Sequence, residues 1–127
     1  MKIDHIALWT NNLERLRSFY ITYFQGECGK KYKNEGSEFE SYFLSFSSGS
    51  RVEIMSIPGL TTDIGQQHIV GIAHLSFRVG SKEAVDLLTS ELRIAGISVY
   101  SEPRFTGDGY YESGILDPDG NQVEIMA

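Results

Sequence analysis

Apolar and polar positions alternate along this chain in a pattern that occurs twice. The first occurrence opens on Ile3–Leu8 and the second on Ile72–Phe77. In both stretches apolar side chains recur at every second position, and this period predicts a β-strand. Each stretch also carries one histidine, His5 or His74, and the two histidines lie 69 residues apart. The chain is therefore predicted to contain the same structural module twice.

A helical pattern follows each opening strand. The first helix is predicted to begin at Asn11 or Asn12 and to end at Gly26, and the second to run from Ser81 to Gly96. Alternating segments then predict three further strands in each half: Cys28–Lys33, Ser41–Phe46 and Arg51–Ile57 in the first, and Ile97–Arg104, Tyr110–Leu116 and Gln122–Met126 in the second.

Together these elements predict an α+β fold of two tandem β-α-β-β-β modules, which form a curved mixed sheet with the helices on its outer face. Module one spans residues 1–57, a linker spans 58–69, and module two spans 70–127, all within a single domain. Because each helix covers only one face of its sheet, the other face needs cover from the second module or from another chain.

The tetrapeptide VEIM is written twice, at Val52–Met55 and at Val123–Met126. Its valine and isoleucine are predicted to face the helix, so that Glu53 and Glu124 face away from it. The same alternation places His5 and His74 on the helix-free faces. A lone histidine or glutamate on a strand is ordinarily structural. Two of each in matching positions favour a site, because imidazole and carboxylate groups together bind divalent cations.

The charge composition narrows the classes of molecule that the protein is expected to bind. The 127 residues include 11 Lys and Arg against 17 Asp and Glu, for a net charge of −6, and no basic cluster is present. We therefore expect no binding to nucleic acid or to a membrane, and a cytoplasmic protein with a small-molecule substrate. The single cysteine, Cys28, cannot form an internal disulfide, which agrees with a reducing compartment.

The paired modules, with a histidine at each opening strand and a glutamate at each closing strand, resemble the vicinal oxygen chelate superfamily. Glyoxalase I, or lactoylglutathione lyase, is the well-studied member that the chain resembles most. The turn Asp117–Gly120, which leads into Glu124, is typical of the superfamily's last hairpin. The resemblance covers nearly the whole chain.

The resemblance implies that His5, Glu53, His74 and Glu124 bind one divalent metal per site, with Ni, Co, Zn, Mn or Fe as candidates. It further implies that Glu124, or in second place Glu53, transfers the proton in a lyase or isomerase reaction on a small carbonyl compound or its thiol adduct. Two alternatives stay open. One is a metal-free protein of the bleomycin-resistance type that binds a drug or metabolite, and the other is an Fe(II) extradiol-type dioxygenase.

The chain departs from bacterial glyoxalase I at two positions that contact glutathione in that enzyme. Trp9 stands in place of an arginine and Ile57 in place of an asparagine. Arg78, the counterpart of Trp9 in module two, is either a replacement anion-binding group or a solvated side chain. Trp9 is a candidate for contact with the substrate by stacking.

The segment Phe105–Ser113 contains two glycines around an aspartate, which predicts a hairpin turn. An alternative is that this loop lines the substrate pocket, with Tyr110 or Glu112 in contact with the substrate. His68, in the linker, is expected to be exposed. The resemblance to glyoxalase I and the one pair of ligands in each module further predict a homodimer.

Overall fold

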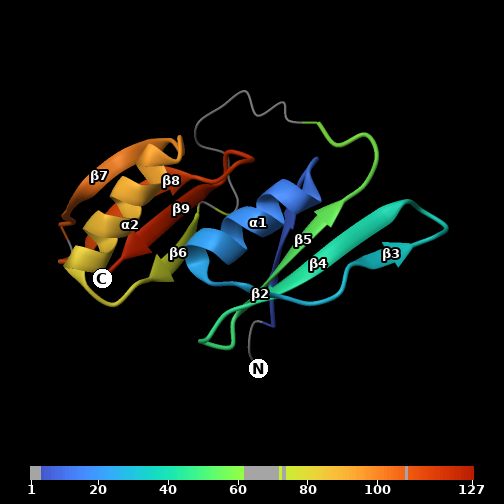
Figure 1. The fold of residues 1–127 in the computed structure, drawn as a ribbon, viewed down its shortest axis with the longest axis horizontal. Coiled ribbons are helices and arrows are strands. Elements are labelled where there is room, and N and C mark those ends of the chain that lie inside the picture. Colours follow the sequence, from blue (N-terminus) through green and yellow to red (C-terminus); the bar gives the residue numbers. More distant parts are fainter. Residues whose placement is uncertain (1–3, 62–71, 73, 108) are drawn as a thin grey trace. The chain divides into compact units, whose positions relative to one another are not determined.

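The computed structural model describes residues 4–61, 72, 74–107 and 109–127. The chain divides into two compact units, residues 1–64 and residues 65–127, here called unit one and unit two. Within the described residues, each unit contains one helix and one sheet, which can be followed in Figure 1.

Unit one contains a mixed sheet and the helix α1. The strand order is β1-β5-β4-β2, with β3 also paired to β4; β1 and β5 are parallel, and the other pairs are antiparallel. The elements are β1 (Ile6–Trp9), α1 (Leu13–Phe24), β2 (Glu27–Cys28), β3 (Tyr32–Asn34), β4 (Phe39–Ser45) and β5 (Arg51–Ser56).

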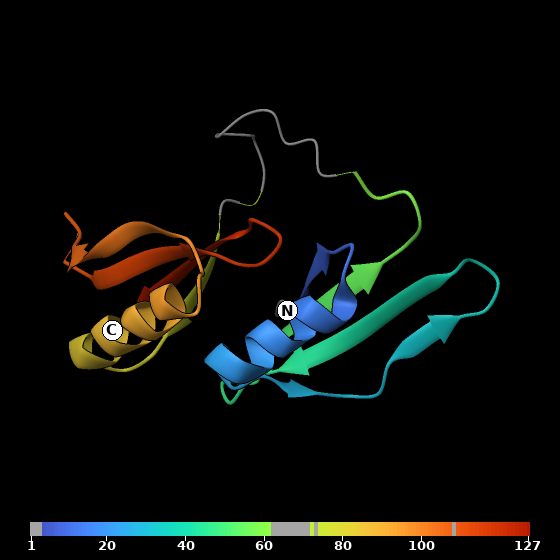
Figure 2. The same ribbon diagram turned by 45° about the horizontal axis from the view of Figure 1, so that its top comes forward.

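Helix α1 packs on one face of this sheet, against β4 and β5 (Figure 2). Asn12 is its N-cap, because the Asn12 side chain accepts a hydrogen bond from the backbone N–H of Arg15 at 3.0 Å. The predicted stop at Gly26 is wrong by one residue. Gln25, with φ of +56°, adopts the left-handed conformation that ends the helix. The fully buried core side chains of unit one are Leu16, Tyr20, Leu44 and Ile54.

The predicted strand Cys28–Lys33 is also corrected, because it is two short strands. β2 pairs with the end of β4 at Leu44 and Ser45, and β3 pairs with its beginning. Gly29 lies between them and donates its backbone N–H to the Phe43 carbonyl at 3.2 Å. Glycine and the two lysines after it have low strand propensity, which is the physical reason for the interruption.

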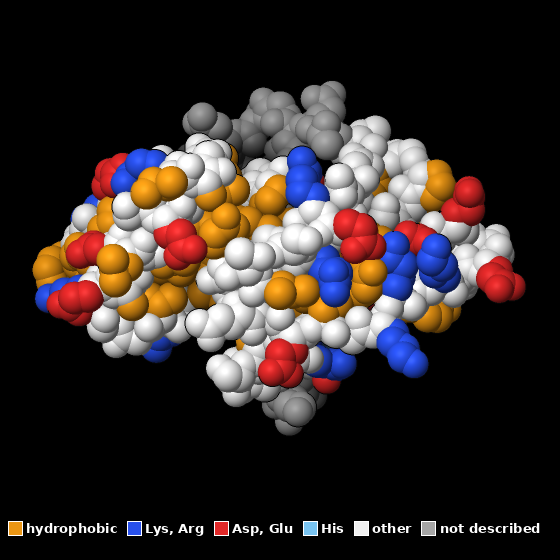
Figure 3. All heavy atoms as spheres, viewed as in Figure 1, with side chains coloured by type: hydrophobic (Ala, Val, Ile, Leu, Met, Phe, Trp, Pro, Cys, Tyr) orange, Lys and Arg blue, Asp and Glu red, His pale blue; other side chains and the backbone are white. Residues whose placement is uncertain are grey.

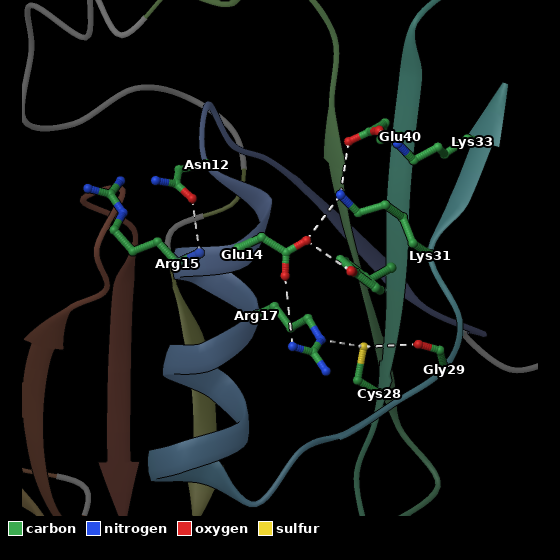
Figure 4. A network of polar contacts seen from close by, with 10 residues as sticks. Asn12, Glu14, Arg15, Arg17, Cys28, Gly29, Lys31, Lys33 and Glu40 are labelled. Carbon is green, nitrogen blue, oxygen red and sulfur yellow. Dashed lines mark hydrogen bonds and ion pairs between the residues drawn. The ribbon is translucent and has the colours of Figure 1, made fainter. Parts of the chain in front are cut away.

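On the helix side of unit one, charged side chains connect α1 with β4 and with the segment after β2 (Figure 4). Lys31 Nζ lies 3.0 Å from Glu14 and 3.1 Å from Glu40, and the Tyr42 hydroxyl donates to Glu14 at 2.9 Å. Arg17 Nε donates to Cys28 Sγ at 3.3 Å, so the single cysteine of the chain accepts a hydrogen bond from α1. On the face that Figure 3 shows, Lys and Arg side chains are interspersed with Asp and Glu side chains. Exposed pairs of this kind each contribute little to stability.

Unit two repeats the arrangement. Its strand order is β6-β9-β8-β7, with β6 and β9 parallel and the other pairs antiparallel. The elements are β6 (Leu75–Arg78), α2 (Lys82–Ile94), β7 (Val99–Phe105), β8 (Tyr111–Leu116) and β9 (Gln122–Met126). The predicted N-cap Ser81 and the stop at Gly96, with φ of +84°, are both confirmed.

A polar contact lies inside the core of unit two, between α2 and β8. Thr89 Oγ1 donates to the Val85 carbonyl at 2.6 Å and lies 2.6 Å from Ser113 Oγ. Both hydroxyl-bearing residues are buried. The fully buried apolar side chains of this core are Val85, Leu92, Ile115, Val123 and Ile125.

The last hairpins of the two units have the same turn. In unit one, Gly49 donates to the Phe46 carbonyl and Phe46 to the Ser50 carbonyl; in unit two, Gly120 donates to Asp117 and Asp117 to Asn121. Both glycines have positive φ, +84° and +86°. The α+β class and the two tandem modules are thus confirmed, with one mixed sheet in each unit.

The opening strands begin later than predicted. β1 starts at Ile6 and β6 at Leu75, so His5 and His74 each immediately precede their strand. Residues 1–3 and most of the linker, including His68, lie outside the described residues. Among the helices of the described part, none is long and apolar enough to cross a membrane.

Candidate functional site

In unit one, His5 and Glu53 meet on the helix-free face. Val52 and Ile54 are buried on the helix side of β5, so Glu53 between them points to the opposite side. Glu53 pairs in register with Ala7, two residues after His5. His5 Nε2 consequently lies 3.7 Å from Glu53 Oε2, and the Glu53 side chain is 15% exposed.

Asp4 and Phe43 hold the His5 ring, and the sequence analysis missed both. Asp4 Oδ2 lies 3.0 Å from His5 Nδ1, which leaves Nε2 directed to Glu53. The Phe43 ring meets the imidazole edge-on at 5.0 Å. The hydrogen bond with His5, followed by that with Arg51, holds the pKa of Asp4 below its ordinary value. Partners of this kind fix the orientation of metal-binding histidines.

In unit two, His74 and Glu124 form the matching pair. Glu124 lies between the buried Val123 and Ile125 of β9 and pairs in register with Ser76, two residues after His74. His74 Nε2 lies 3.2 Å from Glu124 Oε2, and the Glu124 side chain is 22% exposed. The register that places each glutamate beside its histidine is therefore the same in both units.

The chemistry of each pair suits a divalent cation. Two ligands that each lie about 2.0–2.2 Å from one cation are about 2.8–3.6 Å apart for octahedral to tetrahedral angles, which is close to the observed separations of 3.2 and 3.7 Å. Within the described ranges, no group of three or more His, Cys, Asp or Glu side chains is gathered to hold a metal ion. Each unit thus brings together two of the four predicted ligands.

A tyrosine that sequence reasoning missed lies on the helix-free face of unit two. Tyr100 belongs to β7, and its ring lies over Gly114 of β8, which pairs in register with Glu124. Burial, followed by the charges of Glu124 and Glu112, raises the pKa of Tyr100. The only sequence signal was a glycine within an otherwise regular strand, which indicates a close approach of another group.

Glu112 shares this face, because it pairs in register with Met126, two residues after Glu124. Arg104 Nη1 lies 3.9 Å from Glu112 Oε1 and donates to Ser101 Oγ at 2.6 Å. Tyr110 lies outside the strands, in the turn that joins β7 to β8, where the Thr106 N–H donates to the Tyr110 carbonyl at 2.8 Å. The turn interpretation of this segment is therefore confirmed, and Glu112 but not Tyr110 lies on a strand next to that of Glu124.

Arg78 is exposed and donates to the carbonyl of Ala127. Trp9, its counterpart in unit one, is 48% exposed and meets the Phe39 ring edge-on at 6.4 Å. Tyr32, which is 55% exposed, meets the same ring at 6.1 Å. The helix-free face of unit one thus carries an aromatic group, defined here as Trp9, Tyr32 and Phe39.

A surface hollow of about 570 Å³ adjoins this aromatic group in unit one. Phe39, Ile57 and Pro58 supply apolar lining, and the charged lining includes three carboxylates and one lysine: Glu35, Glu38, Glu40 and Lys33. The surplus of carboxylates disfavours a ligand with net negative charge in the hollow.

Comparison with known proteins agrees with this fold. The model of the family described as the Glyoxalase/Bleomycin resistance protein/Dioxygenase superfamily matches residues 2–125. A curated relative, the uncharacterized protein YqjT of Bacillus subtilis strain 168, is 30% identical over 98% of both chains.

Two solved structures illustrate the likeness of fold. A glyoxylase/bleomycin resistance protein/dioxygenase domain from Frankia sp. EAN1pec has a TM-score of 0.83 and 19% identity, with 99% of this chain and 96% of that chain covered. The trypanothione-dependent glyoxalase I of Leishmania major has a TM-score of 0.78 and 19% identity, with 99% and 86% covered.

Proposed function

Because the chain belongs to the Glyoxalase/Bleomycin resistance protein/Dioxygenase superfamily, we propose that it is a metal-dependent lyase or isomerase of the glyoxalase type. Its substrate is a small carbonyl compound or the thiol adduct of one. The observation that carries this proposal is the repeated pair of histidine and glutamate, set in the same register in both units.

In this proposal His5, Glu53, His74 and Glu124 hold one divalent cation, which polarises the carbonyl group of the substrate when bound. Glu124 accepts the proton from the carbon beside that carbonyl and returns it to the neighbouring carbon, and Glu53 is the second candidate for this role. Glu124 is the more exposed of the two carboxylates, at 22% against 15%, which favours access by a substrate. Asp4 orients His5 through the Nδ1 contact.

The aromatic group of unit one supports a substrate with a flat or apolar portion. Trp9 and Tyr32 expose about half of their side chains, and exposed aromatic faces recognise such groups by stacking. Trp9 and Ile57 stand where bacterial glyoxalase I has an arginine and an asparagine in contact with glutathione, which argues against glutathione as the thiol. The same aromatic group favours a second candidate function, metal-free binding of a planar drug or metabolite.

We also propose that the protein acts as a homodimer. Each unit supplies only two ligands, and a stable catalytic metal site ordinarily needs at least three from the protein. In the exchanged arrangement, unit one of one chain completes its site with unit two of the partner chain. A symmetric dimer of this type would contain two identical sites.

The test measures metal content and its dependence on Glu53. After dialysis against Co²⁺ or Ni²⁺ and removal of excess, elemental analysis is expected to find about one metal per chain. Glu53→Gln should lower metal affinity at least about tenfold without unfolding the protein. Glu40→Gln is the matched control, because Glu40 lies on the next strand, where its ion pairs are with Lys31 and Lys33.

Failure to retain any of the metals, with no rise in thermal stability when they are added, would refute the metal-dependent function. The binding function would then be tested by quenching of Trp9 fluorescence with planar ligands. Equal metal affinities for Glu53→Gln and Glu40→Gln would remove Glu53 from the ligand set.

A further inference from the structure

The ring of Tyr100 occupies the space that a side chain at position 114 would fill. A Cβ atom built on Gly114 would lie 2.6 Å from Tyr100 Cε2 and 2.7 Å from its hydroxyl oxygen. Cβ atoms do not approach other atoms so closely, so any residue larger than glycine would displace the phenol. The hydroxyl end of Tyr100 therefore lies directly over the backbone of Gly114, the in-register neighbour of Glu124.

A β-bulge directs Tyr100 to this place. Val99 pairs with Ile115 and Ser101 with Gly114, so the register shifts between them and Tyr100 is the additional residue of β7. Ile115 is fully buried on the helix side, whereas Gly114 belongs to the helix-free side. Bulges redirect side chains in this way, often beside active sites.

The position of Tyr100 differs from that of a core residue. The side chain is 46% exposed, so the ring is not a packing element of the interior. Among hydrogen bonds between the described residues, none involves the Tyr100 hydroxyl. A tyrosine hydroxyl is an O–H donor as well as an acceptor, and no partner among the described residues uses this donor.

We propose that the Tyr100 hydroxyl donates a hydrogen bond to an oxygen atom of the substrate bound beside Glu124. This inference rests on the proposed function. If Glu124 takes a proton from the carbon next to a carbonyl, the carbonyl oxygen is only two bonds from that carbon. A donor held over the neighbouring strand can then reach this oxygen, and negative charge that develops there strengthens the hydrogen bond. The ligand class is the small carbonyl compound of the proposed function, with its carbonyl oxygen as the acceptor for the phenol.

The test uses acetohydroxamate, a probe with two adjacent oxygens, and the full-length protein loaded with Co²⁺. Binding is measured by isothermal titration calorimetry, and metal content and melting temperature are measured in parallel. Tyr100→Phe, which removes only the hydroxyl, should weaken acetohydroxamate binding about 5- to 10-fold with metal content unchanged. Gly114→Ala, which displaces the ring, should weaken it in the same direction. Tyr111→Phe is the matched control, since the Tyr111 hydroxyl donates to Asp86 of α2 instead.

The outcomes are distinguishable. Wild-type affinity in Tyr100→Phe, with one metal still bound per chain, would overturn the role of Tyr100 and leave the proposed function intact. If the wild-type protein takes up no metal and binds no acetohydroxamate, the proposed function fails, and the inference about Tyr100 fails with it. An equal loss in Tyr111→Phe would indicate a general structural effect and would also overturn the assignment.

Discussion

Replacement of Thr89 by valine should destabilise the protein through a single buried hydroxyl group, that of Ser113. Thr89 has one hydroxyl proton and donates it to the Val85 carbonyl, so Ser113 must be the donor in the 2.6 Å contact between the two hydroxyls. Valine has nearly the shape of threonine but cannot accept that hydrogen bond. The Ser113 hydroxyl would then stay buried without an acceptor in this contact, because Ser113 is only 1% exposed.

The expected cost of Thr89→Val is about 1–3 kcal/mol, the penalty for a buried polar group that loses its partner. Ser113→Ala should cost less, about 0.5–1.5 kcal/mol, because Thr89 keeps its bond to Val85. The double variant removes both hydroxyls and leaves no buried hydroxyl without a hydrogen-bond acceptor. It should therefore be more stable than the sum of the two single changes predicts, by about 1 kcal/mol or more.

The measurement is urea unfolding followed by far-UV circular dichroism, with free energies obtained from the midpoint and slope of each transition. Thermal scans give a second readout, since 1 kcal/mol corresponds to roughly 3–5 °C for a chain of this length. If the costs of the single variants simply add in the double variant, the two hydroxyls do not share a hydrogen bond and the reasoning is refuted.

Two further predictions concern assembly and helix ends. Mixed His5→Ala and Glu124→Ala chains, each inactive alone, should regain activity after subunit exchange, because one hybrid site then has all four ligands; no recovery despite demonstrated exchange would exclude the exchanged dimer. Gln25→Gly should raise the free energy of unfolding in urea by about 0.5–1 kcal/mol, since glycine adopts φ near +56° without steric cost. Gly96→Ala, at φ of +84°, should lower it by about 1 kcal/mol, and shifts of the same sign in both variants would contradict this explanation.

The sequence predicted the parts of the site that depend on strand period. In a strand, a glutamate between two buried aliphatic residues points away from the buried face. Because this pattern occurs at both Glu53 and Glu124, the sequence predicted that each glutamate shares a face with the histidine of its module. The N-caps Asn12 and Ser81 were predictable for a similar reason, because a short polar side chain before an apolar helical pattern has a local hydrogen bond to make.

The features that the sequence did not predict depend on contacts between strands or on irregular backbone. Tyr100 lies over Gly114, the in-register neighbour of Glu124, only because the register of β7 slips by one residue and Gly114 lacks a side chain. Asp4 acts through its neighbour His5, a relation that a period cannot reveal. Gln25 ends α1 in place of the adjacent glycine, a choice between two neighbouring residues that the helical period does not determine.

Phe43 and Gly114 occupy equivalent positions, since each pairs in register with the glutamate of its own unit. In unit one this position carries an aromatic ring, Phe43. In unit two it is Gly114, and the ring of Tyr100 from the adjacent strand lies over it. Under the proposed function, substitutions among Trp9, Tyr32 and Phe39 would change ligand preference without altering the segment that carries Glu124 and Tyr100. If the proposed function holds, selectivity and proton chemistry can evolve in separate stretches of the gene, and a directed-evolution library confined to codons 9–43 would sample the first while sparing the second.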